Sequence, residues 1–192
     1  MKKKIVYIVL LVAIVLGGLK IYDVYFNYRF MEITPGKVYK SGIIPPHKIE
    51  GFVKKYHIKT IIDLLGPVTT DTINNPEMPQ DILNEKIACN KIQGLNWYNI
   101  PSDQVPNQIN LKKFFEVMDN KENYPVLIHC YHGIGRAQIY SAIYRIEYEG
   151  FTGEEARKKI VFPLLFSSFD DGTPKGEYLK AYKSRKQIAA EK

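Results

Sequence analysis

The segment 126–148 constrains the fold of this chain more than any other part of the sequence. It opens with a short apolar run at 126–128, which is typical of a strand buried on both faces. Glycines follow at 133 and 135, and the pattern over 136–148 is helical. A buried strand, a glycine-containing loop and a helix in direct succession indicate an α/β unit, in which ligands bind at the carboxyl end of the strand.

The rest of the sequence alternates in the same way, and its 192 residues suit one domain with a proper core. A hydrophobic content of 45% and a charged content of 24% are those of a folded globular protein. The patterns predict strands at 38–41, 60–65 and 97–100, and helices at 47–56, 80–92, 136–148 and 152–160, with an amphipathic helix after Asn107 or Asn110 and a loop at 66–79. We therefore expect an α/β fold with a central, mostly parallel sheet flanked by helices.

The N-terminus is a separate segment. Three lysines at 2–4 precede an unbroken apolar run at 5–19, and aromatic residues follow at 22–28. We predict an uncleaved membrane helix through residues 5–19; a cleaved signal segment is the alternative, and a buried helix of the domain is disfavoured because nothing polar interrupts the run. With the lysines on the cytoplasmic side, the rest of the chain is expected outside the cytoplasm, periplasmic or exported. Residues 23–37 are interpreted as a tether.

The loop between strand and helix carries the chemistry. Five residues lie between Cys130 and Arg136, and Gly133 and Gly135 allow successive backbone N–H groups to turn inward as an anion-binding nest. The helix that follows adds its positive end, which favours a thiolate at Cys130. The Arg136 guanidinium can hold two phosphoryl oxygens at once. These residue types predict in-line attack of the thiolate on a phosphate monoester, through a phosphocysteine that water hydrolyses.

This loop resembles the Cys-x5-Arg signature of the protein tyrosine phosphatase superfamily, in its dual-specificity-like branch. The similarity extends to 38–42, to 61–65 and to 154–156, and spans about residues 34–165. It implies a phosphotyrosine-phosphatase-like fold, a catalytic Cys130 and Arg136, and a phosphate-binding loop formed by Tyr131, His132, Gly133, Ile134, Gly135 and Arg136. The predicted organisation is an anchor or signal segment with tether at 1–30, a phosphatase domain at 31–175 and a basic tail at 176–192.

Ala137 departs from the family pattern, which has serine or threonine after the arginine. That hydroxyl is thought to steady the thiolate as the phosphoenzyme breaks down, so the departure concerns hydrolysis more than binding. Three interpretations follow: an active phosphatase, a phospho-ligand-binding pseudophosphatase, or a membrane-tethered interaction domain with a vestigial loop. The intact cysteine, glycines and arginine disfavour the third.

A departing alkoxide needs a proton, and the family takes it from an aspartate on a loop before the cysteine. Asp103 stands 27 residues before Cys130, between prolines and just past a predicted strand. We assign it as the general acid, although an aspartate beside proline also forms turns. Asp170 and Asp171 are the alternatives. Asp63 is expected to cap or brace the end of its strand.

The remaining histidines and the second cysteine have simpler interpretations. His129 is expected to be an interior histidine whose ring bonds to backbone and supports the loop, and His132 to face the substrate region. Cys89 is expected to be an ordinary buried thiol. A zinc site of Cys130, His129, His132 and Cys89 is disfavoured because the spacing does not match structural zinc, and a Cys89–Cys130 disulfide is a minor hypothesis. No metal or cofactor is predicted.

The sequence indicates the class of the substrate through its charge and the residues of the loop. The net charge of +7 suits nucleic acid, anionic lipid or phosphorylated substrates alike, and its lysines and arginines line no stripe that indicates nucleic acid. The inner loop positions are nearly neutral apart from Arg136, which favours a phosphorylated protein or a small, singly charged phosphate ester. Attachment to a membrane instead favours a lipid phosphate. Tyrosine-phosphatase-like activity is the preferred prediction.

Overall fold

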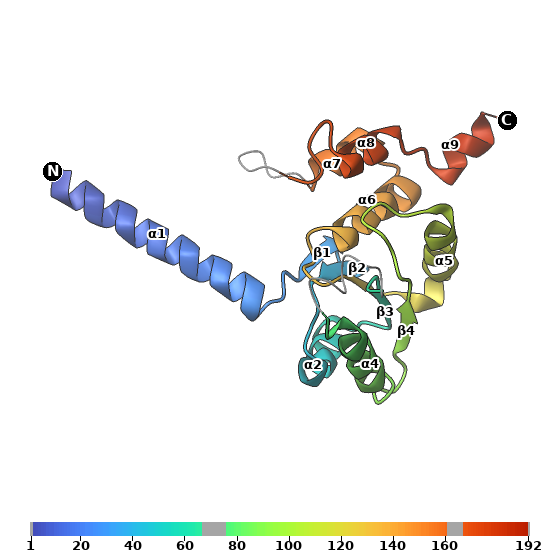
Figure 1. Cartoon of the computed structure of the whole chain (residues 1–192), viewed down its shortest axis with the longest axis horizontal. Coiled ribbons are helices and arrows are strands. Elements are labelled where there is room, and N and C mark those ends of the chain that lie inside the picture. The colour runs from blue at the N-terminus through green and yellow to red at the C-terminus, as the bar shows by residue number, and fades with distance from the viewer. Residues whose placement is uncertain (1, 67–75, 161–166, 192) are drawn as a thin grey trace.

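The computed structural model describes residues 2–66, 76–160 and 167–191, and it contains a five-stranded sheet with helices on both faces (Figure 1). The elements in chain order are α1 (Lys2–Tyr25), β1 (Met31–Thr34), β2 (Val38–Ser41), α2 (Pro46–Tyr56), β3 (Thr60–Asp63), α4 (Met78–Cys89), β4 (Asn96–Asn99), α5 (Gln108–Asp119), the 3₁₀ turn η1 (Lys121–Asn123), β5 (Val126–His129), α6 (Arg136–Glu149), α7 (Gly153–Lys158), α8 (Pro174–Ala181) and α9 (Arg185–Ala190).

The sheet has the strand order β1-β2-β5-β3-β4. β2, β5, β3 and β4 are parallel, which confirms the predicted mostly parallel sheet, and β1 pairs antiparallel with β2 at the edge. In this register Ser41, His129, Asp63 and Asn99 lie level with one another. The carboxyl ends of the parallel strands therefore lie side by side at one end of the sheet, and β5 is the central strand.

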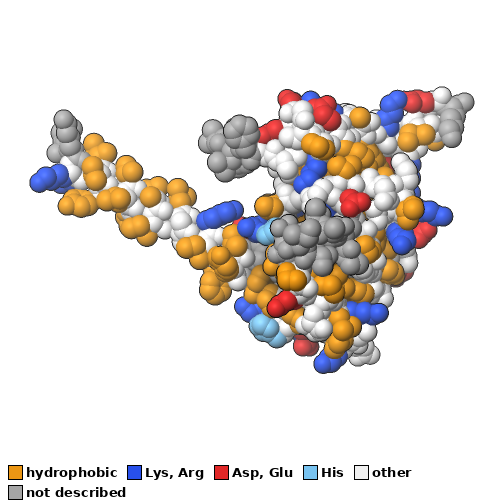
Figure 2. Space-filling view, viewed as in Figure 1, with side chains coloured by type: hydrophobic (Ala, Val, Ile, Leu, Met, Phe, Trp, Pro, Cys, Tyr) orange, Lys and Arg blue, Asp and Glu red, His pale blue; other side chains and the backbone are white. Residues whose placement is uncertain are grey.

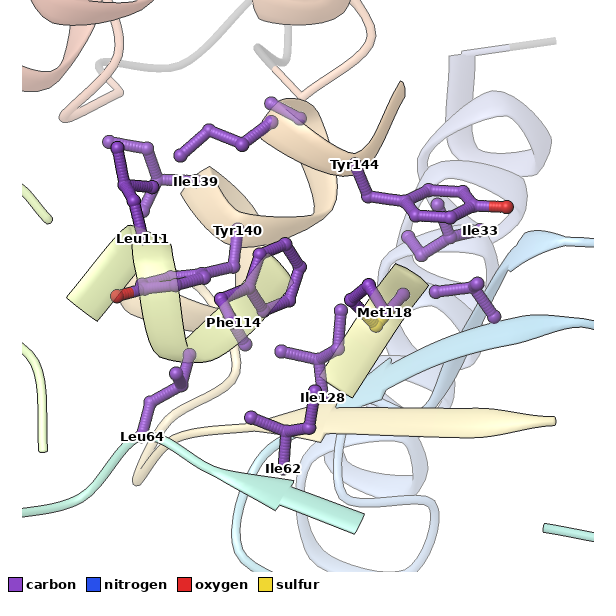
Figure 3. Packing of buried hydrophobic residues seen from close by; sticks show 14 of the residues in the cluster. Ile33, Ile62, Leu64, Leu111, Phe114, Met118, Ile128, Ile139, Tyr140 and Tyr144 are labelled. Atoms are coloured by element: carbon purple, nitrogen blue, oxygen red, sulfur yellow. The ribbon is translucent and has the colours of Figure 1, made fainter. Parts of the chain in front are cut away.

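Two apolar clusters cover the sheet, one on each face. Helices α5 and α6 cover one face, where Phe114 and Tyr140 pack at 5.0 Å between ring centroids above Ile62 and Ile128 (Figure 3). Helices α2 and α4 cover the other face, and the side chains of alternate strand residues such as Leu127 pack against them. Because side chains alternate along a strand, each strand supplies both clusters, and the apolar run at 126–128 is buried on both sides as predicted.

The N-terminal helix α1 projects away from the sheet and its helices (Figure 1). Its stretch Lys3–Tyr25 is long and apolar enough to cross a membrane, and none of its most apolar window is buried. Apolar side chains cover its surface in the space-filling view (Figure 2). The helix continues to Tyr25, beyond the predicted apolar run, so it includes the first residues of the segment interpreted as a tether.

The later part of that expected tether is also structured. Met31–Thr34 forms the edge strand β1, which the sequence pattern missed because four residues with one buried side chain give little periodicity. Before it, the ring of Phe30 stacks on Tyr56 of α2 with 4.3 Å between centroids. The chain is therefore part of the domain from Tyr28 onward.

Local signals set most helix ends. Asn107 accepts a hydrogen bond from Asn110 N at the start of α5, and Thr152 and Glu155 form the predicted capping box at the start of α7. Helix α4 begins at Met78, ahead of the predicted residue 80, because Pro79 is suited to the first turn; the middle of the loop predicted at 66–79 lies outside the described residues. Residues 176–181 of the predicted tail belong to α8, whose Leu179 is fully buried.

Candidate active site

Cys130 follows β5 directly and lies at the carboxyl edge of the sheet, where the predicted loop joins α6. Only 3% of its surface is exposed. Its Sγ accepts a hydrogen bond from the backbone N–H of Ala137, in the first turn of α6, at 3.5 Å. The positive end of that helix thus meets the sulfur.

The carbonyl groups of the loop are held away from its centre. Ile43 N donates to the carbonyl of Tyr131 at 3.0 Å, the Arg29 guanidinium to that of His132 at 2.8 Å, and Lys40 Nζ to that of Gly133 at 3.0 Å. In a trans peptide the C=O and the N–H point in opposite directions. The N–H groups of residues 132–134 therefore turn toward the inside of the loop, which is the arrangement of an anion-binding nest.

Gly133 is required where the loop approaches β2. Its φ is +71°, and a Cβ built there would lie 2.5 Å from the backbone nitrogen of Gly42 and 2.6 Å from the carbonyl carbon of Ser41. A side chain would have to move backbone atoms, so residue 133 is fixed as glycine by both conformation and space. The sequence predicts this glycine as part of the nest, and its contact with β2 is an additional reason for it.

Arg136 connects the loop to the segment that follows β4. Its guanidinium is buried, and Nη1 donates to the carbonyls of Leu64 and Ser102 at 3.1 and 3.3 Å. Ser102 is held in turn, because its hydroxyl accepts from Tyr140 Oη at 2.9 Å. The backbone next to Asp103 is thus bonded to the same arginine that is predicted to grip phosphate.

Asp103 lies on this segment with an exposed side chain, and it does not line the cavity above Cys130. Its neighbour Gln104 does line it, with Oε1 3.1 Å from the position of a Cβ on Gly135. Asp103 is therefore one residue away from the cavity wall. Asp170 and Asp171 have other contacts, since Asp170 accepts from Ser167 N and Asp171 pairs with Arg157 and Lys180.

A cavity of about 570 Å³ opens above the sulfur. Its wall includes the predicted residues Cys130, Tyr131, His132, Ile134, Gly135 and Arg136, and also Leu65, Met78, Gln104, Ser168 and Lys175. The volume is typical of a small-molecule site and far exceeds that of one phosphate. Of the predicted loop only Gly133 is turned away from this cavity, toward β2.

Two lysines near the loop were missed in the sequence. Lys40 is buried behind it; burial lowers the pKa of Lys40, and the charge of Cys130 opposes that effect. Lys175 of α8 is half-buried at the cavity wall, and burial likewise lowers the pKa of its ammonium group. The prediction of a site nearly neutral apart from Arg136 considered only loop positions, and the structure adds these cations from distant parts of the chain.

His129 is buried, but its ring bonds to a carboxylate and not to backbone as predicted. Nε2 lies 2.8 Å from Glu85 Oε1 of α4 and 3.7 Å from Asp63 Oδ1. Burial alone would lower the pKa of His129, but the charges of Glu85 and Asp63 outweigh it and raise the pKa to about 9. Burial raises the pKa of Asp63 to about 7. The carboxylate was not predicted because Glu85 is 44 residues away in sequence.

The second thiol is separate from the site. Cys89 is fully buried in the cluster between the sheet and α2 and α4, whereas Cys130 belongs to the cluster on the opposite face. Both cysteines are free. The disulfide hypothesis and the four-residue zinc alternative are therefore wrong for this fold. Asp63 braces the end of β3 as predicted, by accepting from Leu65 N at 2.8 Å.

These features define a class of fold and site: a parallel sheet with a cysteine-arginine loop at its carboxyl edge. Solved phosphatase structures share that fold. The chain is similar to the core catalytic domain of the PP-IP phosphatase Siw14 from S. cerevisiae, with 20% identity, a TM-score of 0.58, and coverage of 84% of this chain and 91% of the other. For P. aeruginosa TpbA the values are 15%, 0.58, 82% and 86%, and for PTPMT1 they are 18%, 0.57, 84% and 97%.

Likeness at 15 to 20% identity shows the fold alone, which this chain shares with these solved structures. The predicted phosphotyrosine-phosphatase-like α/β architecture is thereby confirmed. No protein-family model matches the sequence. No curated protein matches it either.

Proposed function

We propose that this protein is a cysteine-dependent phosphatase that hydrolyses phosphate monoesters. The observation that carries the proposal is the loop itself: Sγ of Cys130 receives the N–H of Ala137 at the start of α6, while three loop carbonyls are bonded outward. This arrangement concentrates donors and positive potential at one point beside a nucleophile, as stabilisation of a transferring phosphoryl group requires.

The reaction proceeds in two displacements. The Cys130 thiolate attacks phosphorus, the S–P bond forms, and the ester P–O bond breaks as Asp103 gives its proton to the departing oxygen. A water molecule then attacks phosphorus, with Asp103 accepting its proton, the S–P bond breaks, and inorganic phosphate leaves with the thiolate restored. Arg136 and the loop N–H groups hold the phosphoryl oxygens through both steps.

The substrate is proposed to be a phosphorylated protein or a small phosphate ester. Toward a protein, the proposed activity is tyrosine-specific or dual-specificity-like. A TpbA variant has been solved in complex with phosphotyrosine, at 15% identity and a TM-score of 0.53, and Siw14 acts on PP-IP. The width of the cavity supports a bulky leaving group such as a phenol. The exposed side chains of Tyr131 and Ile134, which line the cavity, offer apolar contact to the leaving group.

A phospho-ligand-binding protein without turnover is the second candidate. It is favoured by Ala137, which is fully buried in the first turn of α6 and has no hydroxyl to offer the sulfur. Binding of phosphate and formation of the phosphocysteine do not need that hydroxyl. Only the second displacement distinguishes the two candidates.

The experiment is turnover of para-nitrophenyl phosphate by the full chain in detergent under reducing conditions. We expect steady turnover that Cys130→Ser abolishes and that Cys89→Ala, which removes the other thiol, retains. Asp103→Asn is expected to lower the rate by at least tenfold and to remove the alkaline limb of the pH profile, whereas Glu116→Gln on the exposed side of α5 leaves it unchanged.

Each other outcome has its own meaning. A single burst of nitrophenolate equal to the protein concentration, with no steady turnover, supports the binding protein. Activity that survives Cys130→Ser contradicts the proposed nucleophile. A pH profile that Asp103→Asn leaves intact contradicts the assignment of the acid.

The proposal includes attachment to a membrane through residues 5–19. The exposed apolar surface of α1 supports it, as do Tyr22, Tyr25 and Phe26, which are exposed at the end of the helix where the headgroup region of a bilayer would lie. The lysines at 2–4 favour an orientation with the catalytic domain outside the cytoplasm.

A further inference from the structure

The cavity above Cys130 has a cation on its wall that the loop does not supply. Lys175 lies in the first turn of α8, 45 residues beyond the cysteine. Its Nζ is 3.2 Å from the position that a Cβ on Gly135 would occupy, next to Gln104 Oε1. Since residue 135 directly precedes Arg136, the ammonium group stands beside the phosphate loop.

The contacts of Lys175 involve a hydroxyl and an aromatic ring. Nζ donates to Ser168 Oγ at 3.3 Å and lies 5.2 Å from the centre of the Phe169 ring. Within the described ranges, no carboxylate pairs with it. On the same helix, by contrast, Lys180 pairs with Asp171 and Glu177. A half-buried ammonium group without a counterion is costly unless an anion joins it.

That anion is not the phosphate in the loop alone. Arg136 and the inward N–H groups already supply donors for one phosphoryl group, and the cavity of about 570 Å³ extends well beyond it. Burial lowers the pKa of Lys175 most, and the charges of Cys130 and Arg136 raise and lower it respectively. The ammonium group is thus near the reacting sulfur but is supported by a different element.

We propose that Lys175 forms a subsite for a second phosphoryl group, so that the preferred ligands carry two phosphates linked directly or on neighbouring atoms. The inference rests on the proposed role of the loop as a phosphate site. One phosphoryl group lies in the loop against Cys130 and Arg136, and the adjacent group meets Lys175, with Gln104 beside it. The position next to Gly135 requires the two groups to be close.

The test is calorimetric binding to the full chain in detergent at pH 7 without divalent metal. The ligands are inorganic phosphate, with one phosphoryl group, and methylenediphosphonate, with two that cannot be separated by hydrolysis. We expect methylenediphosphonate to bind at least tenfold more tightly. Lys175→Met is expected to lower the ratio of the two affinities about tenfold, and Lys175→Arg to keep it. The matched control, Lys113→Met on the exposed side of α5, removes one charge elsewhere and should keep the ratio.

Thermal unfolding of Lys175→Met shows whether this variant is folded. If it is not, Lys175→Arg still tests whether a positive charge at residue 175 keeps the ratio. An unchanged ratio in folded Lys175→Met would overturn the proposal. Equal weakening of both ligands would overturn it too, because Lys175 would then contact the single phosphate in the loop. Failure of inorganic phosphate to bind at all would contradict the phosphate site itself, which is the separate failure of the proposed function.

Discussion

Behind the loop, a buried histidine is surrounded by carboxylates. The pKa of His129 is raised to about 9 in spite of its burial, because Glu85 Oε1 lies 2.8 Å from Nε2 and Asp63 Oδ1 lies 3.7 Å from the same nitrogen. Glu85 is itself fixed by the indole N–H of Trp97 at 3.0 Å. Removal of one partner from a buried ion pair leaves the other charge without compensation, which is usually strongly destabilising.

This pair predicts a pH dependence of stability. The folded pKa of His129, about 9, lies above its ordinary 6.5, so its contribution is complete below pH 6.5 and is lost as the pH rises through 9. At about 1.4 kcal/mol for each pKa unit, the loss is on the order of 3 kcal/mol. Glu85→Gln should flatten this fall, and Glu116→Gln, an exposed control, should not. Denaturant unfolding at pH 6.5 and 9 measures both; an equal fall in Glu85→Gln would contradict the pairing.

Among single residues, the predicted residues of the loop are contiguous in sequence. The strand, Cys130, both glycines and Arg136 follow one another, so their local chemistry was readable. Lys175, Lys40 and Glu85 come from other elements and have no local pattern that distinguishes a site residue from a surface or core residue. Lys40 reaches the loop because β2 pairs with β5, whereas Glu85 and Lys175 come from α4 and α8.

At the scale of elements, the segment after α1 supports the catalytic loop. Gly42 N donates to the carbonyl of Tyr28 at 2.7 Å, and Arg29 donates to the carbonyl of His132 at 2.8 Å. Tyr28 and Arg29 both have positive φ, at 55° and 50°, which is uncommon outside glycine and persists only where surrounding contacts hold it. The segment that follows α1 and the loop after Cys130 are therefore connected directly.

Loss of this connection should weaken phosphate binding. Arg29→Met in the full chain removes the hydrogen bond to the carbonyl of His132. We expect KM for para-nitrophenyl phosphate to rise about 3- to 10-fold. This rise is equivalent to roughly 1 kcal/mol for one charge-assisted hydrogen bond at a partly exposed site. Lys113→Met serves as the control for charge. An unchanged KM would show that the loop keeps its shape without Arg29. By the same reasoning, a soluble form should begin before Tyr28 and not at residue 31.

At the scale of the whole molecule, an exposed apolar helix and a folded domain are joined by a short connection (Figures 1 and 2). None of the most apolar stretch of the helix is buried against the domain. Its apolar surface would be more stable in the hydrocarbon core of a bilayer than in water. We expect the full chain to remain in the membrane fraction after an alkaline carbonate wash, and a chain lacking residues 2–20 to be released. The intact N-terminus, detected by mass spectrometry, distinguishes an anchor from a cleaved signal. Release of the full chain by the wash, or a mature N-terminus after residue 19, would contradict the anchor while leaving the chemistry of the loop untouched.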